Sequence, residues 1–337
     1  MNNYKIYFGV DVSKDYFTTT VIFHDKKETF KIVSKPKEFE KKIKSYVRNL
    51  EKSEVLILME HTGVYHLPLA EYLAKRDYPV GVINPYSMKN FIEAKMSRVK
   101  LVLSEAEGTD KVDSTYIAEY GKQFFEGKLF KPKTEVQKQI EAKLRIREDF
   151  QKQLNMLKNQ REALRWIPME KPDKNIAYYD EVIKIIELKI KELDKEIEKL
   201  CKDNYPREYE LLSSIPGIKN RAISMILSIL RGFEGFESAK QLGSFIGICP
   251  CPSESGSTVK GRGGIKKRGS GYVRKILYLC GLSAVRANKY CREFYQRLIN
   301  RGKAKKLALI AVGYKLIRQA FGVLKSGQPF REDLLTT

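Results

Sequence analysis

The chain has 337 residues and carries 63 Lys and Arg against 41 Asp and Glu, a formal net charge of +22. A surface this positive indicates a polyanionic partner, with nucleic acid as the first candidate. The hydrophobic share of 42% excludes a globally disordered chain, and no apolar run approaches the ~20 residues that span a bilayer.

The N-terminus and the cysteines argue against a secreted protein. The opening MNNYKIYFGVDVSK lacks a signal-peptide pattern because Asp11 interrupts its short apolar run. Five cysteines at irregular spacing do not form a disulfide framework. We therefore expect a cytoplasmic, nucleoid-associated protein without a membrane partner.

The positive charge is concentrated at the C-terminal end. From Cys251 onward there are 19 basic and 4 acidic residues, so +15 of the +22 lies in the last 87 positions. The first 250 residues hold 44 basic and 37 acidic groups. This asymmetry predicts that the C-terminal part binds phosphates and that the N-terminal part uses acidic side chains.

Residues 1–130 are expected to form an α/β domain. Short runs rich in β-branched and aromatic residues indicate strands, and the first three are close enough for an antiparallel meander. The predicted elements are strands at 4–12, 16–24, 28–34, 55–59 and 79–83 and helices at 37–52, 67–75 and 110–120. Their order, β-β-β-α-β-α-β-α, is that of an RNase H-like (RuvC-like) domain.

Residues 131–204 are predicted to form a long helical hairpin with coiled-coil character. Thr134 followed by Gln137 is typical of a capping box, and Pro168 and Pro172 interrupt the helical pattern. The second arm has an apolar heptad seam, formed by Ile186, Ile190, Leu193, Ile197 and Leu200. The segment is expected to be a connector or an oligomerising coiled coil, with a simple spacer as the alternative.

Residues 205–330 are expected to form a mostly helical domain, with 331–337 as a tail. The sequence Ile-Pro-Gly-Ile at 215–218 has the form of a helix-hairpin-helix turn, in which glycine lets backbone amides approach a phosphate. Residues 253–271 are rich in Gly, Ser and basic side chains, so we expect a flexible phosphate-binding loop. Helices are predicted at 272–287 and 304–325.

Four carboxylates occupy positions that an RNase H-like fold would bring together. Asp11 lies in the first strand, Glu60 ends the buried fourth strand, and Asp110 and Asp113 share one face of a helix. Such a cluster repels itself and needs a cation, and its oxygen ligands suit Mg²⁺, with Mn²⁺ as an alternative. Two such ions can stabilise both oxygens of a phosphodiester displacement. A solvated helix face is the competing explanation for the Asp pair.

Several short phrases match one known family in the same order along the chain. They are Gly9-Val10-Asp11-Val12-Ser13-Lys14, Met59-Glu60-His61-Thr62-Gly63 with Tyr65, Asn84-Pro85, Thr109-Asp110-Lys111-Val112-Asp113 with Ile117-Ala118, Ile215-Pro216-Gly217-Ile218, and a Gly-, Pro- and Lys-containing run from Gly247 to Arg274. Together they resemble the DEDD transposases of the Piv/MooV (IS-one-ten) insertion-sequence family.

The resemblance implies a RuvC-like domain, a coiled-coil connector and a C-terminal transposase domain with a nucleophilic serine. It further implies a DNA recombinase, in many members guided by a structured bridge RNA. By position, Asp11, Glu60, Asp110 and Asp113 would bind metal. Ser255 would attack a DNA phosphate and form a phosphoserine, with Ser253 or Ser257 as alternatives. No histidine lies in the C-terminal half, so the carboxylate site is expected to assist the serine.

The expected partners are DNA (element ends and target), a bridge RNA and further copies of the chain in a dimer or tetramer. Phosphate contacts would position the nucleic acid while RNA pairing reads its sequence. The residues predicted to make these contacts are Gly217, Lys219, Lys260, Arg262, Lys266, Lys267, Arg268, Arg274 and Lys275.

Two other functions remain open on the sequence. One is a RuvC-like metal-dependent nuclease or Holliday-junction resolvase, in which water is the nucleophile and Ser255 is incidental. The other is an architectural nucleic-acid-binding protein without chemistry.

Overall fold

The chain divides into two compact units, Met1–Pro132 and Lys133–Thr337, which are described separately. The computed structural model describes residues 4–24, 26–48, 50–61, 63–99, 109–126, 129–168, 172–255, 259–265 and 269–331.

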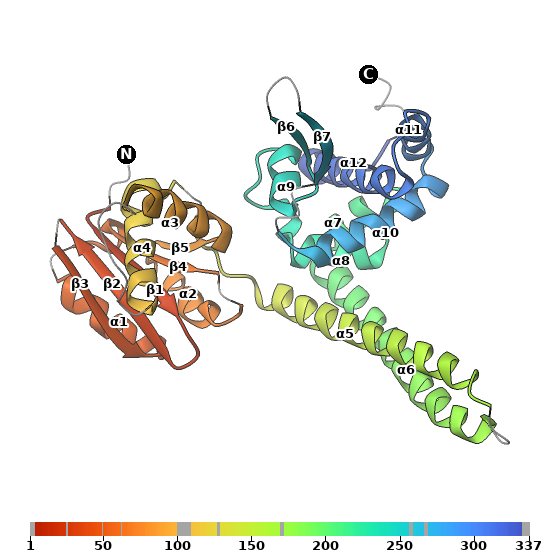
Figure 1. Ribbon diagram of the computed structural model, residues 1–337, viewed down its shortest axis with the longest axis horizontal. Helices are drawn as coiled ribbons and strands as arrows, with labels where there is room; N and C mark the ends of the chain where they lie inside the picture. The colour runs from red at the N-terminus through yellow and green to blue at the C-terminus, as the bar shows by residue number, and fades with distance from the viewer. Residues whose placement is uncertain are drawn as a thin grey trace. The chain divides into compact units, whose positions relative to one another are not determined.

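The first unit contains a five-stranded mixed sheet with the order β3-β2-β1-β4-β5 (Figure 1). The first three strands form the predicted antiparallel meander, and β4 runs parallel to both β1 and β5. The elements are β1 (Ile6–Val12), β2 (Tyr16–Phe23), β3 (Lys26–Val33), α1 (Pro36–Tyr46), a 3-10 turn (Lys52–Glu54), β4 (Val55–Glu60), α2 (His66–Ala74), β5 (Val80–Ile83), α3 (Pro85–Val99) and α4 (Thr109–Phe124).

Helices cover both faces of this sheet. Alternate residues of β1 and β4 point to opposite sides, so apolar side chains stand on both faces and pack against helices there. Phe8, Val10 and Met59 lie in a core shared with α1 and α2. Tyr7 and Leu58 lie in a second core shared with α3 and α4. The central strands are therefore buried on both faces, which for β4 agrees with its predicted burial.

Two predictions for this unit need correction. The helix predicted over 37–52 ends at Tyr46. Helix α3 is missing from the predicted order, because Met88 and Phe91 are the main side chains that it buries and its periodicity is weak. Its start is nevertheless encoded locally, since Asn84 Oδ1 accepts a hydrogen bond of 2.9 Å from the Tyr86 amide and Pro85 begins the helix.

Helix α4 lies directly on β1 because residue 9 has no side chain. A Cβ atom added to Gly9 would sit 2.2 Å from the backbone nitrogen of Ala118 and 2.3 Å from the carbonyl oxygen of Ser114. Both atoms belong to α4, so the glycine determines how closely this helix approaches the sheet. The same helix carries the predicted Asp110 and Asp113.

The second unit is helical apart from one two-stranded sheet in its described residues. Its elements are α5 (Glu135–Leu164), α6 (Pro172–Asn204), α7 (Pro206–Ser213), α8 (Asn220–Ser228), a 3-10 turn (Arg231–Phe233), α9 (Ala239–Ile246), β6 (Pro250–Ser255), β7 (Val259–Ile265), α10 (Gly271–Ala287), α11 (Lys289–Asn300) and α12 (Lys305–Ser326).

Helices α5 and α6 form a long antiparallel hairpin arm (Figure 1). The predicted capping box is present, because the Gln137 amide donates to Thr134 Oγ1 and the Thr134 amide donates to Gln137 Oε1. The part of the arm nearest α7 and α8 packs into the main apolar core of the second unit. Its outer half has a small cluster of its own around Leu154, Ile183 and Ile190. An ion pair of 2.6 Å between Arg147 Nε and Asp194 Oδ1 links the two helices.

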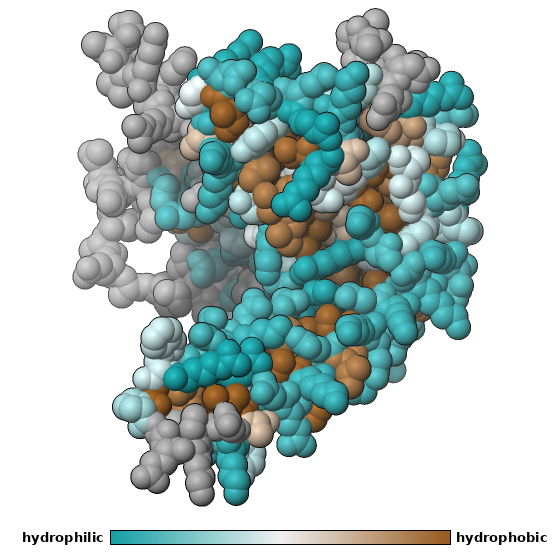
Figure 2. All heavy atoms as spheres, turned by 90° about the vertical axis from the view of Figure 1, so that its right-hand side faces the viewer, coloured by the Kyte–Doolittle hydropathy of each residue, from teal (hydrophilic) through white to brown (hydrophobic). Residues whose placement is uncertain are grey.

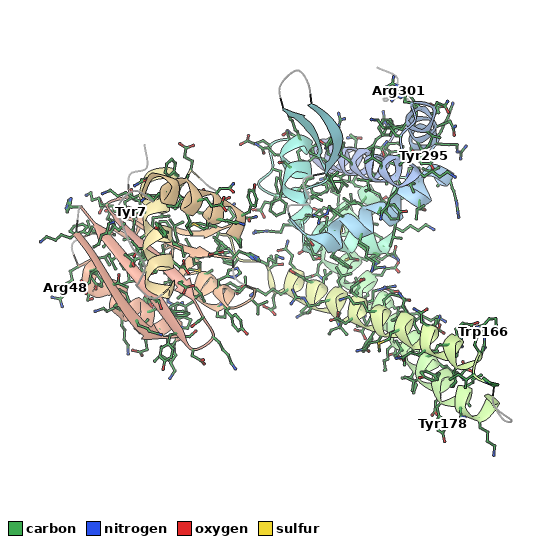
Figure 3. The ribbon with its side chains drawn as sticks, in the orientation of Figure 1. Tyr7, Arg48, Trp166, Tyr178, Tyr295 and Arg301 are labelled. Atoms are coloured by element: carbon green, nitrogen blue, oxygen red, sulfur yellow. The ribbon has the colours of Figure 1, made fainter. Side chains whose placement is uncertain are left out.

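The outer half of the arm exposes apolar side chains. Trp166 and Tyr178, labelled in Figure 3, are 82% and 73% exposed. Brown apolar side chains stand between teal polar ones over the lower part of Figure 2, where the arm faces the viewer. Val182, Ile185 and Leu188 form an exposed apolar row along α6.

The prediction of a flexible loop over 253–271 is wrong in part, because the described residues form an antiparallel hairpin of β6 and β7. Gly and Ser have low β propensity, so the local composition did not indicate strands. Helix α11 was also not predicted. The apolar residues of this helix do recur at helical spacing, so its sequence pattern was present and the prediction missed it; they are Tyr290, Cys291, Phe294, Tyr295, Leu298 and Ile299.

Helix α12 is long and apolar enough, by length and composition alone, to cross a membrane. Half of its most apolar window is buried, at 50%, and Val312, Leu316 and Ile317 lie fully inside the core. A central helix of a globular core has these properties.

Replacing Gly9 by Ala is expected to destabilise the first unit by about 1–3 kcal/mol or more, because the new methyl overlaps backbone atoms that cannot rotate away. Urea unfolding of the full chain measures the change. Gly322→Ala is the control, since a Cβ at that helical position meets nothing within 4 Å. Equal stability of the two variants would show that α4 does not need the glycine.

Candidate active site

Asp11 and Glu60 are brought together by the register of two neighbouring parallel strands. Val10 of β1 pairs with Met59 of β4, so the next residue on each strand points to the opposite face. Tyr7 and Leu58, which share that face, pack beneath α3 and α4. Asp11 and Glu60 therefore lie side by side on the face that α4 covers.

Asp113 comes to the same place from α4. It precedes Ser114, whose carbonyl oxygen lies against Gly9, two residues before Asp11. A buried hydrogen bond of 2.9 Å between Thr20 Oγ1 and Ser114 Oγ fixes this turn of α4 on β2. Thr20 also lies 3.1 Å from Thr115 Oγ1. Gly9 stands in the phrase at residues 9–14 that resembles the transposase family, but no role was predicted for it, and Thr20 and Ser114 were not singled out by the sequence.

The electrostatics of Glu60 record this convergence. Burial raises the pKa of its carboxyl group, and the negative charges of Asp113 and Asp11 raise it further. Three of the four predicted carboxylates are thus close enough to interact. The side chain of Asp110, the fourth, lies outside the described residues.

The chemistry of the three carboxylates suits a hard divalent cation, because all their donor atoms are oxygens and their mutual repulsion favours a positive charge. They do not form a closed ligand set by themselves. Among the side chains that the structure describes, no group of three or more His, Cys, Asp or Glu is close enough to hold a metal ion.

Two histidines lie next to the carboxylates in the sequence. The rings of His61, which follows Glu60, and His66 are 4.6 Å apart between centroids. His66 is buried at the start of α2, whereas His61 is exposed.

Ser255 is the last residue of β6 and pairs with Val259 across the hairpin. Ser253 pairs with Gly261 in the same pair of strands, and the register shifts between Cys251 and Ser253. The side chains of Ser253 and Ser255 are outside the described residues, and so is the whole of Ser257. The hairpin therefore places the backbone of two candidate nucleophiles on one strand.

Two of the predicted phosphate contacts have partners inside the fold. Lys275 Nζ pairs with Glu148 of α5, a carboxylate that is only 10% exposed and that also binds Arg221 of α8. The guanidinium of Arg274 donates to backbone carbonyls. These contacts give both residues a structural role that their positions in the sequence did not indicate.

The remaining predicted contacts divide into two groups. Gly217 is buried against α10, where an added Cβ would sit 2.6 Å from Ala284 Cβ, whereas Lys219 is exposed immediately before α8. The side chains of Lys260 and Arg262 lie outside the described part of the structure. Lys266, Lys267 and Arg268 lie outside it entirely.

Neutralising Glu60 is expected to stabilise the protein when metal is removed. Glu60→Gln should raise the Tm in EDTA, because it removes a half-buried charge that Asp11 and Asp113 repel. In wild type, saturating Mg²⁺ should raise the Tm, since a ligand at 100 times its Kd contributes about 2.7 kcal/mol. The magnesium response should be much smaller in Glu60→Gln.

Thermal unfolding of the full chain with and without Mg²⁺ tests this expectation. Glu38→Gln is the charge-matched control, because Glu38 lies on α1 and pairs with the exposed Lys41. Equal magnesium shifts in the two variants would contradict a metal site at Glu60.

Comparison with known proteins gives a consistent result along most of the chain. A model described as "Transposase", for DEDD transposases of the IS110 type, matches residues 8–164. A second, "Transposase IS116/IS110/IS902 family", matches residues 209–296. The first match spans Asp11, Glu60, Asp110 and Asp113, and the second spans the serine hairpin.

Relatives with a curated description extend the match to nearly the full length. The chain is 26% identical over 331 residues to the "Pilin gene-inverting protein" of Moraxella lacunata, covering 97% of this chain and 98% of that protein. The protein of the same name from Moraxella bovis gives the same values. A Streptomyces coelicolor protein of insertion element IS110 is 26% identical over 117 residues, 35% of this chain and 29% of that protein. The chain belongs to the IS116/IS110/IS902 family of transposases, which are enzymes of DNA recombination.

Proposed function

We propose that this transposase cuts and rejoins DNA strands through a phosphoserine at Ser255, assisted by a Mg²⁺ site (or Mn²⁺) formed by Asp11, Glu60, Asp110 and Asp113. The observation that carries the proposal is the convergence of Asp11, Glu60 and Asp113, expressed in the raised pKa of Glu60. The strand order β3-β2-β1-β4-β5, with a parallel β1–β4 pair, supports an RNase H-like (RuvC-like) assignment for this unit.

The serine reaction consists of two exchanges at phosphorus. Ser255 Oγ loses its proton and forms a bond to a DNA phosphorus, while one deoxyribose oxygen leaves that phosphorus and takes up a proton. In the second exchange a hydroxyl of another DNA end attacks the phosphoserine and restores the serine hydroxyl. The number of phosphodiester bonds is conserved, so no external energy source is needed.

The carboxylates supply the setting for that reaction. A DEDD transposase domain implies a divalent metal, which when bound would polarise the phosphate and stabilise charge on the exchanged oxygens. Asp11, Glu60 and Asp113 would hold and orient the cation because their strands and helix are fixed by buried contacts. Asp113 depends most on tertiary packing, since α4 sits at its height above the sheet through Gly9.

Nucleic-acid contacts belong mainly to the second unit in this proposal. Lys219 and the cations Lys260, Arg262, Lys266, Lys267 and Arg268 would bind backbone phosphates without reading sequence. Sequence choice would then come from a bridge RNA that pairs with element ends and target DNA. The excess of 19 basic over 4 acidic residues after position 250 supports a polyanionic partner such as RNA or DNA.

A homo-oligomer, dimer or tetramer, also forms part of the proposal. The exposed row of Val182, Ile185 and Leu188 lies on the outer half of α6, on a helix that already packs on α5. Apolar side chains at helical spacing on a free helix face favour contact with another helix. The arm is therefore the segment that we expect to join copies of the chain.

The nucleophile is tested by trapping the covalent product on a cognate DNA junction. Wild type should yield a protein–DNA adduct that maps to Ser255 by mass spectrometry, and Ser255→Ala should lose it completely. Asp11→Ala should reduce adduct formation by about 10²-fold or more, as loss of a charge-stabilising group does elsewhere. Ser253→Ala is the matched control on the same strand.

The competing assignments predict different products. Metal-dependent cleavage that survives Ser255→Ala without any adduct would establish a nuclease or resolvase that uses water. Loss of the adduct in Ser253→Ala or Ser257→Ala, with Ser255→Ala active, would move the nucleophile. Full activity in both Ser255→Ala and Asp11→Ala would refute the proposed mechanism.

RNA guidance is tested independently of chemistry. Sequencing of the RNA that copurifies with the full chain should recover one structured species encoded beside the gene, with segments complementary to donor and target DNA. Recovery of random host RNA alone would contradict a bridge RNA.

A further inference from the structure

The β6–β7 hairpin that carries Ser255 depends on its ends for its orientation. Among the described residues, no third strand pairs with β6 or β7. An isolated two-stranded hairpin is marginally stable in water. Ser255 lies at the end of β6 that is farthest from the first residue, Pro250. Small rotations at the base would therefore displace the serine.

The two ends of the hairpin segment meet at the C-terminus of α9. The chain leaves α9 through Gly247, whose φ of 73° is left-handed, and enters β6 three residues later. On the return, Gly269 has a φ of +87°, and an added Cβ would sit 2.2 Å from the Phe245 carbonyl oxygen. The returning backbone thus lies directly against the end of α9.

One side chain bridges these two crossing segments. Arg274 lies in the first turn of α10, and its Nη1 donates to the Ile246 carbonyl oxygen at 2.9 Å and to the Gly269 carbonyl oxygen at 3.1 Å. The last carbonyls of a helix lack partners within the helix and carry partial negative charge, so a guanidinium is well suited to bind them. The same nitrogen therefore contacts the segment that enters the hairpin and the segment that leaves it.

We propose that Arg274 is a positioning residue, which fixes the base of the serine hairpin, and that phosphate binding is not its role. The structural part of this inference is independent of the reaction, whereas its effect on strand exchange rests on the proposed function of Ser255. Arg274 acts through the backbone at Ile246 and Gly269. Loss of the side chain should leave the hairpin folded less of the time and the serine less well aligned.

The test uses the full chain with Arg274→Ala, Arg274→Lys and the neighbouring control Lys275→Ala. Lys275 occupies the next position of α10 but pairs with Glu148 of α5, so its loss should not release the hairpin. Limited trypsin digestion, followed by mass spectrometry, measures cleavage after Lys260 and Arg262. Single-turnover adduct formation at saturating DNA and the salt dependence of DNA affinity are measured on the same proteins.

In Arg274→Ala, cleavage at the hairpin should become about 10-fold faster, and adduct formation should become about 10- to 100-fold slower. DNA affinity and its salt dependence should be unchanged. Arg274→Lys should be intermediate, because an ammonium group keeps the charge but lacks the rigid planar geometry that holds Nη1 between both carbonyls. Lys275→Ala should match wild type in hairpin cleavage.

A different pattern would overturn the proposal. If Arg274→Ala weakens DNA binding and lowers the salt slope by about one phosphate contact, with hairpin cleavage unchanged, Arg274 binds phosphate directly. If Arg274→Ala is cleaved throughout the chain, the variant has unfolded and Arg274→Lys becomes the test. Hairpin cleavage at the wild-type rate in Arg274→Lys would then refute the positioning role of Arg274. If Arg274→Ala speeds hairpin cleavage but the wild-type protein forms no adduct, the positioning role of Arg274 stands and the proposed serine chemistry is refuted.

Discussion

The contact between α4 and the sheet at Gly9 is the constraint on which the carboxylate site depends. Backbone atoms of Ser114 and Ala118 occupy the space that any side chain at position 9 would need. The hydroxyls of Thr20 and Ser114 then fix the helix along the sheet. The spacing between Asp113 and the two strand carboxylates thus depends on position 9 having no side chain.

Helix α4 carries carboxylates in two opposite environments. Near its start, Asp113 adds to the burial that raises the pKa of Glu60. Two turns later Glu119 is also partly buried, which alone would raise its pKa, but hydrogen bonds and charges from Lys27 and Lys95 lower it overall. The cations Lys27 and Lys95 offset the burial of Glu119, whereas burial and the charges of Asp113 and Asp11 all act to raise the pKa of Glu60. One helix thus contributes to two carboxyl environments whose effects on the pKa are opposite.

The sequence predicts those parts of the molecule that depend on local pattern. Buried runs ending in Asp11 and Glu60 revealed the strands, and Thr134 with Gln137 revealed the start of α5. The role of Gly9 could not be predicted, because its contact lies more than a hundred residues away on α4. Arg274 and Lys275 look alike in sequence, yet one binds two nearby carbonyls and the other binds a carboxylate 127 positions away. The serine hairpin was not predicted because its Gly- and Ser-rich strands lack apolar alternation, whereas α11 has apolar residues at helical spacing that the prediction missed.

In the described part of the chain, β6 and β7 of the serine hairpin pair only with each other. A two-stranded sheet has two open edges, each with backbone groups able to pair with a strand from another molecule. Glycines at 261, 263 and 264 and cations at 260 and 262 give β7 a sequence that is poorly suited to such pairing. The same composition that lowers the β propensity of the hairpin thus protects its open edges from aggregation. Strands of higher β propensity and regular apolar alternation would be easier to predict from sequence but more prone to aggregate.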